Sequence, residues 1–529
     1  MKLAEKQLSN LSTPVLLVAI LGLTFLLRLN FWGQPFQMDE GVYGYIGWGM
    51  LDGLVPYKDV FDHKPPGIYL LYSLVFLLSE PTALNIKVFT TIYTLGTVLV
   101  VFFVASKVAD EKAGLLAALL FGIFSCGPKI EGGGSNTEIF MILPYIFAAH
   151  SLLKAIEKGR RRDYLLTGLW TGVACTIKQV AAVNLLWVGA YLIVRIWRQK
   201  KWTTVARVTA DGCWVTVGAI LPWLPYFIYF YLNDALAHFY FWQVNFNLDY
   251  MARGHGSTST LLVFYHRTKD ILRENGLLWL LALAAIAYYW KELRKAITVD
   301  EGKNSQSWRS SGWFLIAIWP LFSFMGVVAG GRFFPHYYIQ MIPSLAVLGG
   351  VGLIAVVHAL RFKGKEVFRQ PSRILLAALI IWSCVLFVKT DAPYYLRYDA
   401  EQISFRVYGT PLFSVTRFVG NYLKERTQPD DLIYVWAVNP EINFYALRKT
   451  PSPFLVYSTS FARLPWDTHA EVIQSLHRAP PRYIVAMQDM SSFPALKKYI
   501  GQNYQTETAP ELEELKEIIA FEIYRRKEG

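Results

Sequence analysis

Apolar runs long enough to cross a lipid bilayer recur along this chain of 529 residues. The hydrocarbon core of a bilayer is about 30 Å thick, and a helix needs roughly 20 mostly apolar residues to span it. Eleven candidate spans cover residues 12–29, 84–106, 113–128, 138–156, 164–178, 180–197, 209–232, 276–291, 312–329, 337–360 and 374–391. Only 17% of the residues are charged, whereas a soluble chain of this length would form several domains with charged surfaces. The sequence therefore predicts a polytopic α-helical membrane protein with about 11 transmembrane helices.

Lysine and arginine are divided unequally between the two sets of loops. One set carries 24 of them and the other carries nine. The richer loops are residues 1–11, 107–112, 154–163, 195–208, 291–311 and 361–373. Because Lys and Arg gather in cytoplasmic loops, this difference predicts a cytoplasmic N-terminus and an extracytoplasmic C-terminal tail.

A shorter apolar run covers residues 67–78 and follows two consecutive prolines. It is too short for a crossing, and counting it as a span would place the basic cluster at 160–162 outside the cytoplasm. We therefore expect this run to lie in the membrane interface or to re-enter the membrane. Lys2 and Lys6 precede the first apolar run without a small-residue cleavage site, which predicts a retained signal anchor.

The composition changes after residue 391 to that of a soluble domain. Residues 392–529 contain 16 basic and 16 acidic side chains, so the net charge of +13 lies entirely in residues 1–391. This location is typical of the positive-inside pattern and argues against a nucleic-acid partner. Strand-like runs at 431–438, 453–457, 482–487 and 521–526 alternate with helix-like stretches near 411–427, 467–477 and 494–503. We predict a membrane domain over 1–391 and an extracytoplasmic α/β domain over 392–529.

Polar residues near the predicted helix ends gather on the external side. The first external loop, residues 30–83, contains Asp39 and Glu40, and His63 and Lys64 beside the double proline. Two other external loops contribute further candidates: Glu138 at the start of a predicted helix, and Arg332, His336 and Tyr337 in the motif GGRFFPHYY. Such a set of carboxylates and cations at one membrane face suits a reaction at a lipid phosphate. A carboxylate can deprotonate an acceptor hydroxyl, while Lys and Arg stabilise the departing phosphate.

Each candidate also has a purely structural interpretation. Acidic side chains such as Asp39 and Glu138 are usually just solvated in an external loop, and Lys64 could extend along the headgroups. His63 and His336 could be packed polar residues rather than ligands or bases. The combination of these residues, in loops rich in Gly, Pro and aromatic residues, favours a functional site.

A second long external loop, residues 233–275, is unusually aromatic. Its stretch HFYFWQVNFNLDY, residues 238–250, is typical of a membrane-interface belt, in which ring bodies lie in lipid and polar tips in water. A groove for a lipid tail needs the same composition, so both interpretations stay open.

The first-loop sequence DEGVYGYIGWGMLDGLVPYKDVFDHKPPGIY, residues 39–69, resembles the membrane glycosyltransferases of the GT-C superfamily. It is similar to the dolichyl-phosphate-mannose protein mannosyltransferase type, which includes the bacterial aminoarabinose transferase of lipid A and rhizobial lipopolysaccharide glycosyltransferases. The resemblance is specific at this loop, weaker but collinear to about residue 200 and at GGRFFPHYY, and vague beyond residue 391. It implies a polyprenyl-phosphate sugar donor used on the extracytoplasmic face.

The resemblance also implies roles for particular residues. Asp39 matches the catalytic aspartate, Glu40 its neighbour and Lys64 the lysine near the donor phosphate. Glu138 matches a second acidic position that is often Asp in relatives, and Arg332 a phosphate-binding arginine.

The sequence departs from the family pattern where His63 replaces a glutamate that relatives often have before the Lys-Pro pair. The spacing of Asp39, Asp62, His63 and Glu138 contains no recognisable metal motif, so no metal ligand is assigned. A cofactor is not required by the pattern, and dependence on a divalent metal is left open.

These observations and the resemblance together predict a glycosyltransferase, and the resemblance alone implies that it inverts the anomeric configuration. It would move a sugar from a polyprenyl phosphate to a hydroxyl of a lipid, a lipid-linked glycan or a protein, with Asp39 and Glu138 as catalytic carboxylates. The other site residues would bind substrate, and the protein would lie in a bacterial inner membrane. One alternative is a transporter or flippase of a lipid-linked saccharide, which would require ionisable groups or paired broken helices near the midplane. Another is a non-catalytic receptor, which would leave the first loop without a purpose.

Overall fold

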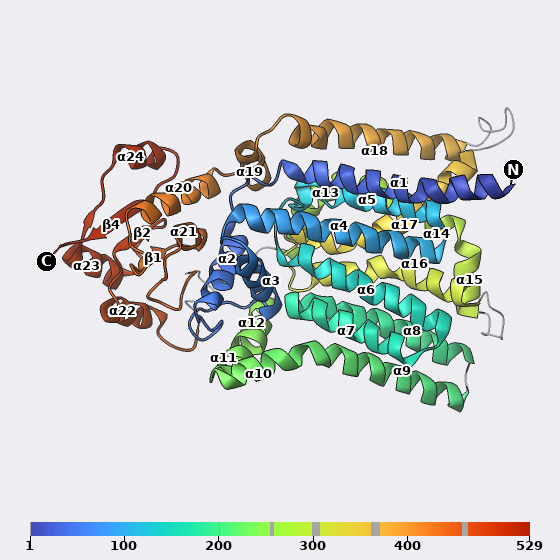
Figure 1. Cartoon of the computed structure of the whole chain (residues 1–529), viewed down its shortest axis with the longest axis horizontal. Coiled ribbons are helices and arrows are strands. Elements are labelled where there is room, and N and C mark those ends of the chain that lie inside the picture. The colour runs from blue at the N-terminus through green and yellow to red at the C-terminus, as the bar shows by residue number, and fades with distance from the viewer. Residues whose placement is uncertain are drawn as a thin grey trace. The chain divides into compact units, whose positions relative to one another are not determined.

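The computed structural model describes residues 2–199, 201–253, 259–298, 307–360, 371–456 and 464–528 (Figure 1). Most of the predicted loop 361–373 and part of the predicted loop 291–311 therefore lie outside the described residues. The chain forms two compact units, each assembled from three stretches of sequence. The first unit contains Met1–Asn30, Thr90–Tyr226 and Arg253–Tyr398, and the second contains Phe31–Phe89, Phe227–Ala252 and Asp399–Gly529. The predicted domain boundary after residue 391 stays a prediction.

The first unit is a bundle of helices. Two of them, α4 and α10, extend into the second unit. The helices are α1 (Lys2–Leu29), α4 (Ala83–Val108), α5 (Glu111–Phe124), η1 (Pro128–Ile130), α6 (Thr137–Lys158), α7 (Arg161–Ile177), η2 (Gln179–Ala182), α8 (Val183–Gln199), α9 (Trp202–Ile220), η3 (Leu221–Trp223), α10 (Leu224–Leu232), α13 (Thr260–Glu274), α14 (Gly276–Tyr288), α15 (Trp290–Thr298), α16 (Ser307–Val328), η5 (Pro335–Met341), α17 (Ile342–Leu360) and α18 (Pro371–Leu396). In this bundle α7 packs between α6 and α9, and α17 packs between α5 and α14. Gly172 permits the α7–α9 approach, because a Cβ there would lie 2.4 Å from the carbonyl oxygen of Ala219.

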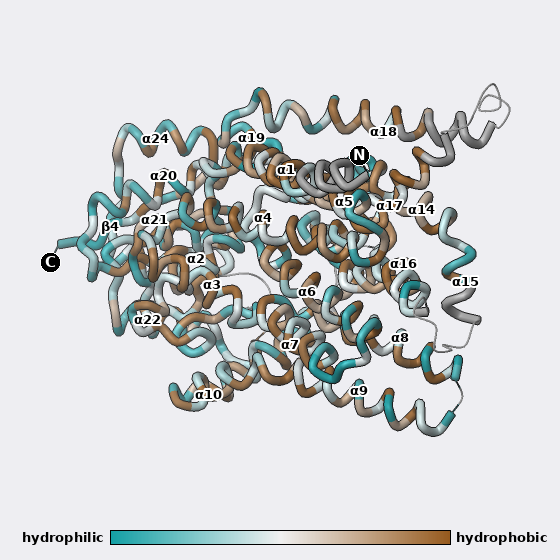
Figure 2. Tube along the Cα trace, turned by 45° about the vertical axis from the view of Figure 1, so that its right-hand side comes forward, coloured by the Kyte–Doolittle hydropathy of each residue, from teal (hydrophilic) through white to brown (hydrophobic). Residues whose placement is uncertain are grey.

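The structure contains helices of the length and hydropathy that membrane spans need. Within the described residues seven segments qualify, and the pair α13 and α14, bent by 78°, would make an eighth. The predicted number of 11 is therefore not confirmed, although a helix occupies every predicted span. The run at 67–78 forms α3 (Pro66–Leu78), whose 13 residues extend only about 20 Å and are too short to cross. Figure 2 shows hydrophobic colour along most of α6 and α17 and hydrophilic colour along α24.

The second unit joins the predicted first external loop, part of the aromatic loop and the C-terminal region. Its elements are α2 (Met38–Leu51), α3, α11 (Leu236–Tyr240), η4 (Phe241–Phe246), α12 (Asn247–Arg253), α19 (Ala400–Tyr408), α20 (Leu412–Glu425), β1 (Ile433–Trp436), α21 (Glu441–Ala446), α22 (Thr468–Arg478), β2 (Tyr483–Ala486), α23 (Pro494–Asn503), β3 (Tyr504–Thr506), α24 (Pro510–Lys516) and β4 (Glu522–Arg526). The sheet has the order β1-β2-β4-β3, with β1 and β2 parallel and the other pairs antiparallel. Every residue of β1 and β2 is buried, so these strands form the centre of the domain core with α20 and α21.

One strand prediction in this domain is wrong. Residues 453–456 of the run predicted at 453–457 form no strand, and Tyr457 lies outside the described residues. The Pro453 carbonyl instead accepts a hydrogen bond from the Phe61 backbone N–H at 2.8 Å, so this apolar run is buried against the first loop. The sheet takes its fourth strand from β3, which pairs with β4. The helices predicted near 411–427, 467–477 and 494–503 are present as α20, α22 and α23.

Candidate active site

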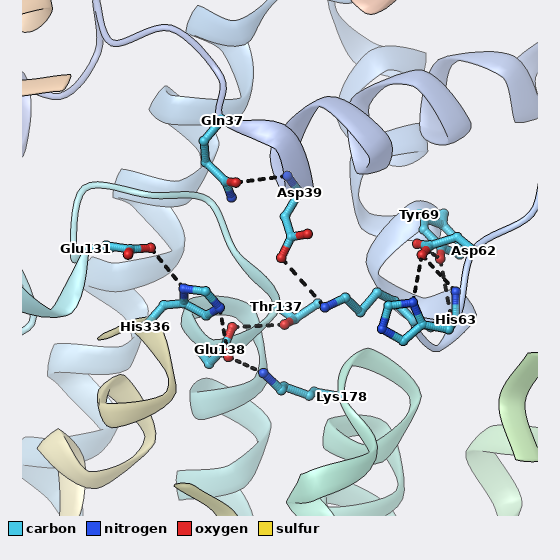
Figure 3. Close-up of polar contacts among 11 residues, drawn as sticks. Gln37, Asp39, Asp62, His63, Tyr69, Glu131, Thr137, Glu138, Lys178 and His336 are labelled. Atoms are coloured by element: carbon cyan, nitrogen blue, oxygen red, sulfur yellow. Dashed lines mark hydrogen bonds and ion pairs between the residues drawn. The ribbon is translucent and has the colours of Figure 1, made fainter. Parts of the chain in front are cut away.

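Asp39 lies in the first turn of α2, where a capping box fixes the backbone. The Gln37 side chain accepts a hydrogen bond from the Asp39 backbone N–H at 2.9 Å (Figure 3). The Glu40 carboxylate accepts one from the Gln37 backbone N–H at 3.1 Å. These bonds satisfy N–H groups that a helix start otherwise leaves unpaired, and the helix dipole favours a carboxylate at this end.

Lys64 lies beside Asp39. Its Nζ is 3.6 Å from Oδ2 of Asp39, and the two side chains are 14% and 20% exposed. Each side chain is therefore packed on most sides and still accessible to a ligand. A carboxylate next to an ammonium can take a proton from a hydroxyl while the cation stabilises a phosphate. The structure thus brings together two of the predicted first-loop residues.

The backbone around Lys64 is held by the aromatic loop. The Lys64 carbonyl accepts hydrogen bonds from the Tyr57 hydroxyl at 2.6 Å and from the Gln243 side chain at 2.8 Å. The His63 carbonyl accepts one from the Asn247 side chain at 2.9 Å. Gln243 belongs to η4, a π-helical turn of the kind that often marks functional sites. Part of the predicted interface belt therefore supports the segment that carries Lys64.

Asp62 anchors the same segment from inside the fold. Its carboxylate accepts hydrogen bonds from the Tyr69 hydroxyl at 2.5 Å and from the His63 backbone N–H at 2.7 Å, and the His63 ring Nδ1 lies 3.3 Å from it. Burial raises the pKa of Asp62, but the hydrogen bond and charge of His63, the charge of Lys64 and the Tyr69 hydroxyl outweigh it. The pKa of this carboxyl therefore lies below its usual range.

Glu40 is fully buried, unlike Asp39. One carboxylate oxygen lies 2.5 Å from Nζ of Lys87 on α4, and the other accepts the Gln37 N–H of the capping box. Lys87 is itself 2% exposed. Both carboxylate oxygens thus bind protein groups, and Glu40 holds α2 in place. Its predicted contact with substrate stays a prediction.

Glu138 forms a second cluster in the first unit, at the start of α6. It is fully buried, pairs with Nζ of Lys178, and accepts a hydrogen bond from the Thr137 hydroxyl at 2.9 Å (Figure 3). Lys178 follows the last residue of α7 and lies 4.0 Å from the ring centroid of Tyr337. This distance is typical of a cation–π contact, so one lysine joins two predicted site residues.

His336 belongs to the same cluster. Its Nδ1 lies 2.8 Å from a carboxylate oxygen of Glu131, and its Nε2 lies 3.9 Å from Glu138 (Figure 3). Glu131 has a φ of 55°, a left-handed conformation that is uncommon for a residue with a side chain. Arg332 is half-buried in the turn before η5, where the flanking Gly331 and Phe333 both have positive φ. The structure therefore joins Glu138, His336 and Tyr337 in the first unit, while the candidates of the first loop belong to the second unit.

Three supporting residues were missed by the sequence predictions. Lys87 lies inside a predicted span, and a buried charge in a span is itself a signal of function or pairing. Lys178 ends the predicted span 164–178, where it was counted among the nine lysines and arginines of the less basic set and was given no role. Tyr69 lies in an apolar run and carried no signal of its own. Within the described ranges, no three His, Cys, Asp or Glu side chains are arranged to hold a metal ion, so no metal site is assigned.

Two parts of this chain match models of known protein families. Residues 63–226 match the family model described as dolichyl-phosphate-mannose-protein mannosyltransferase. Residues 416–527 match a model of the C-terminal domain of the competence-induced protein Ccs4. The first match covers less than half of the chain, and over that stretch it agrees with the predicted resemblance to the dolichyl-phosphate-mannose protein mannosyltransferases.

Solved structures share this fold over nearly the whole chain. ArnT from Cupriavidus metallidurans bound to undecaprenyl phosphate is 14% identical, with a TM-score of 0.59 over 96% of this chain and 97% of that one. The oligosaccharyltransferase AglB from Archaeoglobus fulgidus, in complex with an inhibitory peptide and a dolichol-phosphate, is 13% identical, with a TM-score of 0.54 over 97% of this chain and 74% of that one. An uncharacterised protein of Aquifex aeolicus is 30% identical over 114 residues, which are 20% of this chain and only 27% of that protein.

Proposed function

We propose that this protein is an inverting glycosyltransferase that uses a polyprenyl-phosphate sugar as donor and a hydroxyl of a lipid, a lipid-linked glycan or a protein as acceptor. The Asp39–Lys64 pair carries the proposal, because it places an accessible carboxylate 3.6 Å from an accessible ammonium. The undecaprenyl phosphate of the ArnT structure and the dolichol-phosphate of the AglB structure support the choice of donor class. We place the reaction at the extracytoplasmic face of a bacterial inner membrane, with the N-terminus in the cytoplasm.

The proposed reaction is a single displacement. The Asp39 carboxylate takes the proton of the acceptor hydroxyl as its oxygen forms a bond to the anomeric carbon of the sugar. The bond between that carbon and the phosphate oxygen breaks, and the polyprenyl phosphate leaves with the electron pair. Lys64 stabilises the charge that grows on the leaving phosphate. One displacement inverts the configuration of the anomeric carbon.

The residues that hold Asp39 in place suit it to this role. The capping box and the buried Glu40–Lys87 pair fix the first turn of α2, so the carboxylate needs little reorganisation when the acceptor binds. Lys64 is supported in the same way through its backbone carbonyl. We propose that His63 and Lys64 contact the donor.

The cluster around Glu138 in the first unit has a different proposed role, in substrate binding. Glu138 is fully buried and paired with Lys178. A buried, paired carboxylate is better placed to position Lys178 and keep it charged than to react with a substrate from solvent. We propose that Lys178, Arg332, His336 and Tyr337 bind anionic or sugar groups of a substrate. Glu138→Gln would then weaken substrate binding through Lys178.

The proposed function can be tested with a panel of sugar donors. Purified protein in lipid would be incubated with radiolabelled polyprenyl-phosphate sugars and candidate acceptors, and the release of free polyprenyl phosphate would be measured. Release with one donor, together with sugar on the acceptor, is the expected result. Movement of the intact donor across the bilayer without cleavage of its sugar–phosphate bond would support the transporter alternative and overturn the proposal.

A further inference from the structure

Residues 441–454, called the 441–454 segment below, contact both parts of the first loop that carry the proposed catalytic pair. This segment runs from the start of α21 to just before the undescribed residues 457–463. All of these residues belong to the second unit.

The first contact is between α21 and α2. A Cβ at Gly41 would lie 2.6 Å from the Glu441 backbone nitrogen, and one at Gly44 would lie 3.0 Å from a ring carbon of Phe444. Gly41 and Gly44 are three residues apart and therefore lie on the same face of α2. The start of α21 thus rests directly on the backbone of α2, with no room for a side chain at position 41.

Hydrogen bonds on either side of this contact fix its register. The Phe36 backbone N–H, just before α2, donates to the Tyr445 hydroxyl at 2.7 Å, and the Phe36 ring stacks on Phe444 with 5.1 Å between the centroids. Further along α2, the Tyr45 hydroxyl accepts a hydrogen bond from the Thr450 backbone N–H at 3.0 Å. The two bonds bracket Asp39 in sequence, so the helix start cannot shift along α21 without breaking one of them.

The second contact reaches the Lys64 segment. The Phe61 backbone N–H donates to the Pro453 carbonyl at 2.8 Å, and the Phe61 and Phe454 rings meet edge to face with 5.0 Å between centroids. Phe61 stands three residues before Lys64, with the buried Asp62 between them. One end of the 441–454 segment therefore contacts α2, which carries Asp39, and the other end contacts the stretch of the first loop that carries Lys64.

From these contacts we propose that the 441–454 segment positions the Asp39–Lys64 pair, so that the C-terminal α/β domain serves catalysis as a positioning element. The inference rests on the proposed function for its catalytic consequence. Its structural part, that this segment orders residues 36–45 and 61–64, can be measured without a substrate.

Hydrogen exchange on the full-length protein in lipid tests the structural part. Tyr445→Phe removes the hydroxyl that accepts the Phe36 N–H and keeps the ring, and Gly41→Ala forces α21 away from α2. Both variants should exchange at least tenfold faster at residues 36–45 than wild type, while β1, β2 and β4 keep their protection. Tyr524→Phe on β4 and Gly501→Ala on α23, where an added Cβ meets nothing within 4 Å, are the matched controls.

Kinetics tests the catalytic part. Tyr445→Phe should lower kcat at least fivefold with little change in the donor KM, because it loosens the side that carries the proposed base. Phe454→Leu should instead raise the donor KM, because it loosens the side that carries Lys64. Unchanged exchange at residues 36–45 in Tyr445→Phe overturns the proposal, and so does an equal loss of kcat in the control variants. If exchange changes as predicted while wild type transfers sugar from no donor, the proposed function fails and the positioning of the two segments stands.

Discussion

Replacing Lys87 by Met tests how the proposed catalytic helix is held. The Lys87 and Glu40 side chains are 2% and 0% exposed, with 2.5 Å between Nζ and the carboxylate. Removing one partner of a buried pair leaves an uncompensated buried charge, which costs about 3–5 kcal/mol. Met nearly matches Lys in length, so the loss of packing is small and the buried Glu40 carboxylate accounts for most of the cost. We therefore expect Lys87→Met to lower the free energy of unfolding by about 3–5 kcal/mol and the apparent Tm with it.

The assay is thermal unfolding of each purified variant in the same lipid. Glu40→Gln/Lys87→Met is the matched control, because it removes both charges and keeps a residue that completes a capping box. This double variant should recover most of the loss, since a neutral pair of similar shape often replaces a buried ion pair at little cost. A Tm for Lys87→Met equal to that of wild type, or a double variant less stable than Lys87→Met, would refute the reasoning.

Three further predictions concern the residues around the pair. Asp39→Asn should lower the rate of sugar transfer by about 10²–10⁴-fold, because it removes the proposed base, while the loss of a favourable charge at the helix start lowers the Tm only slightly; a rate within a few fold of wild type would contradict this. Lys64→Gln should weaken binding of polyprenyl phosphate, measured by equilibrium binding, whereas Lys58→Gln in the same loop should not; equal effects would argue against a specific contact. Asp62 has a depressed pKa in the folded protein, so its contribution to stability is present above its ordinary pKa of about 4 and is lost as the pH falls through the lower folded value. The Tm difference between wild type and Asp62→Asn should therefore be constant near neutral pH and shrink in acid, and a difference that grows in acid would reverse the assignment.

The helical part of the fold could be predicted because bilayer thickness sets the length of an apolar run. The same criterion separated the short run at 67–78 from the predicted spans, and this run forms the 13-residue α3. The strand predicted at 453–457 was wrong because an apolar run does not specify its partner. Pro453 and Phe454 are buried against Phe61 rather than in the sheet, and that long-range contact leaves no local pattern.

The candidate residues can be picked out in the sequence, but the sequence does not tell which of them are accessible and which are buried. Asp39 and Glu40 are adjacent acids with equal local signals, and only the fold makes one accessible and buries the other against Lys87. Lys178 lies 40 residues from Glu138 in sequence, and its pairing depends on how α6 packs with α7. Helix packing of this kind is decided by many side chains at once, so no short motif encodes it.

The most direct test of the central claim separates binding from chemistry at the Asp39–Lys64 pair. Wild type, Asp39→Asn and Lys64→Gln would be loaded with the donor found in the panel, and binding and single-turnover transfer would be measured on the same samples. The account predicts that Asp39→Asn binds the donor like wild type and transfers almost no sugar, whereas Lys64→Gln loses affinity. Transfer by Asp39→Asn at the wild-type rate, with donor bound, would show that another group is the base and would contradict the account.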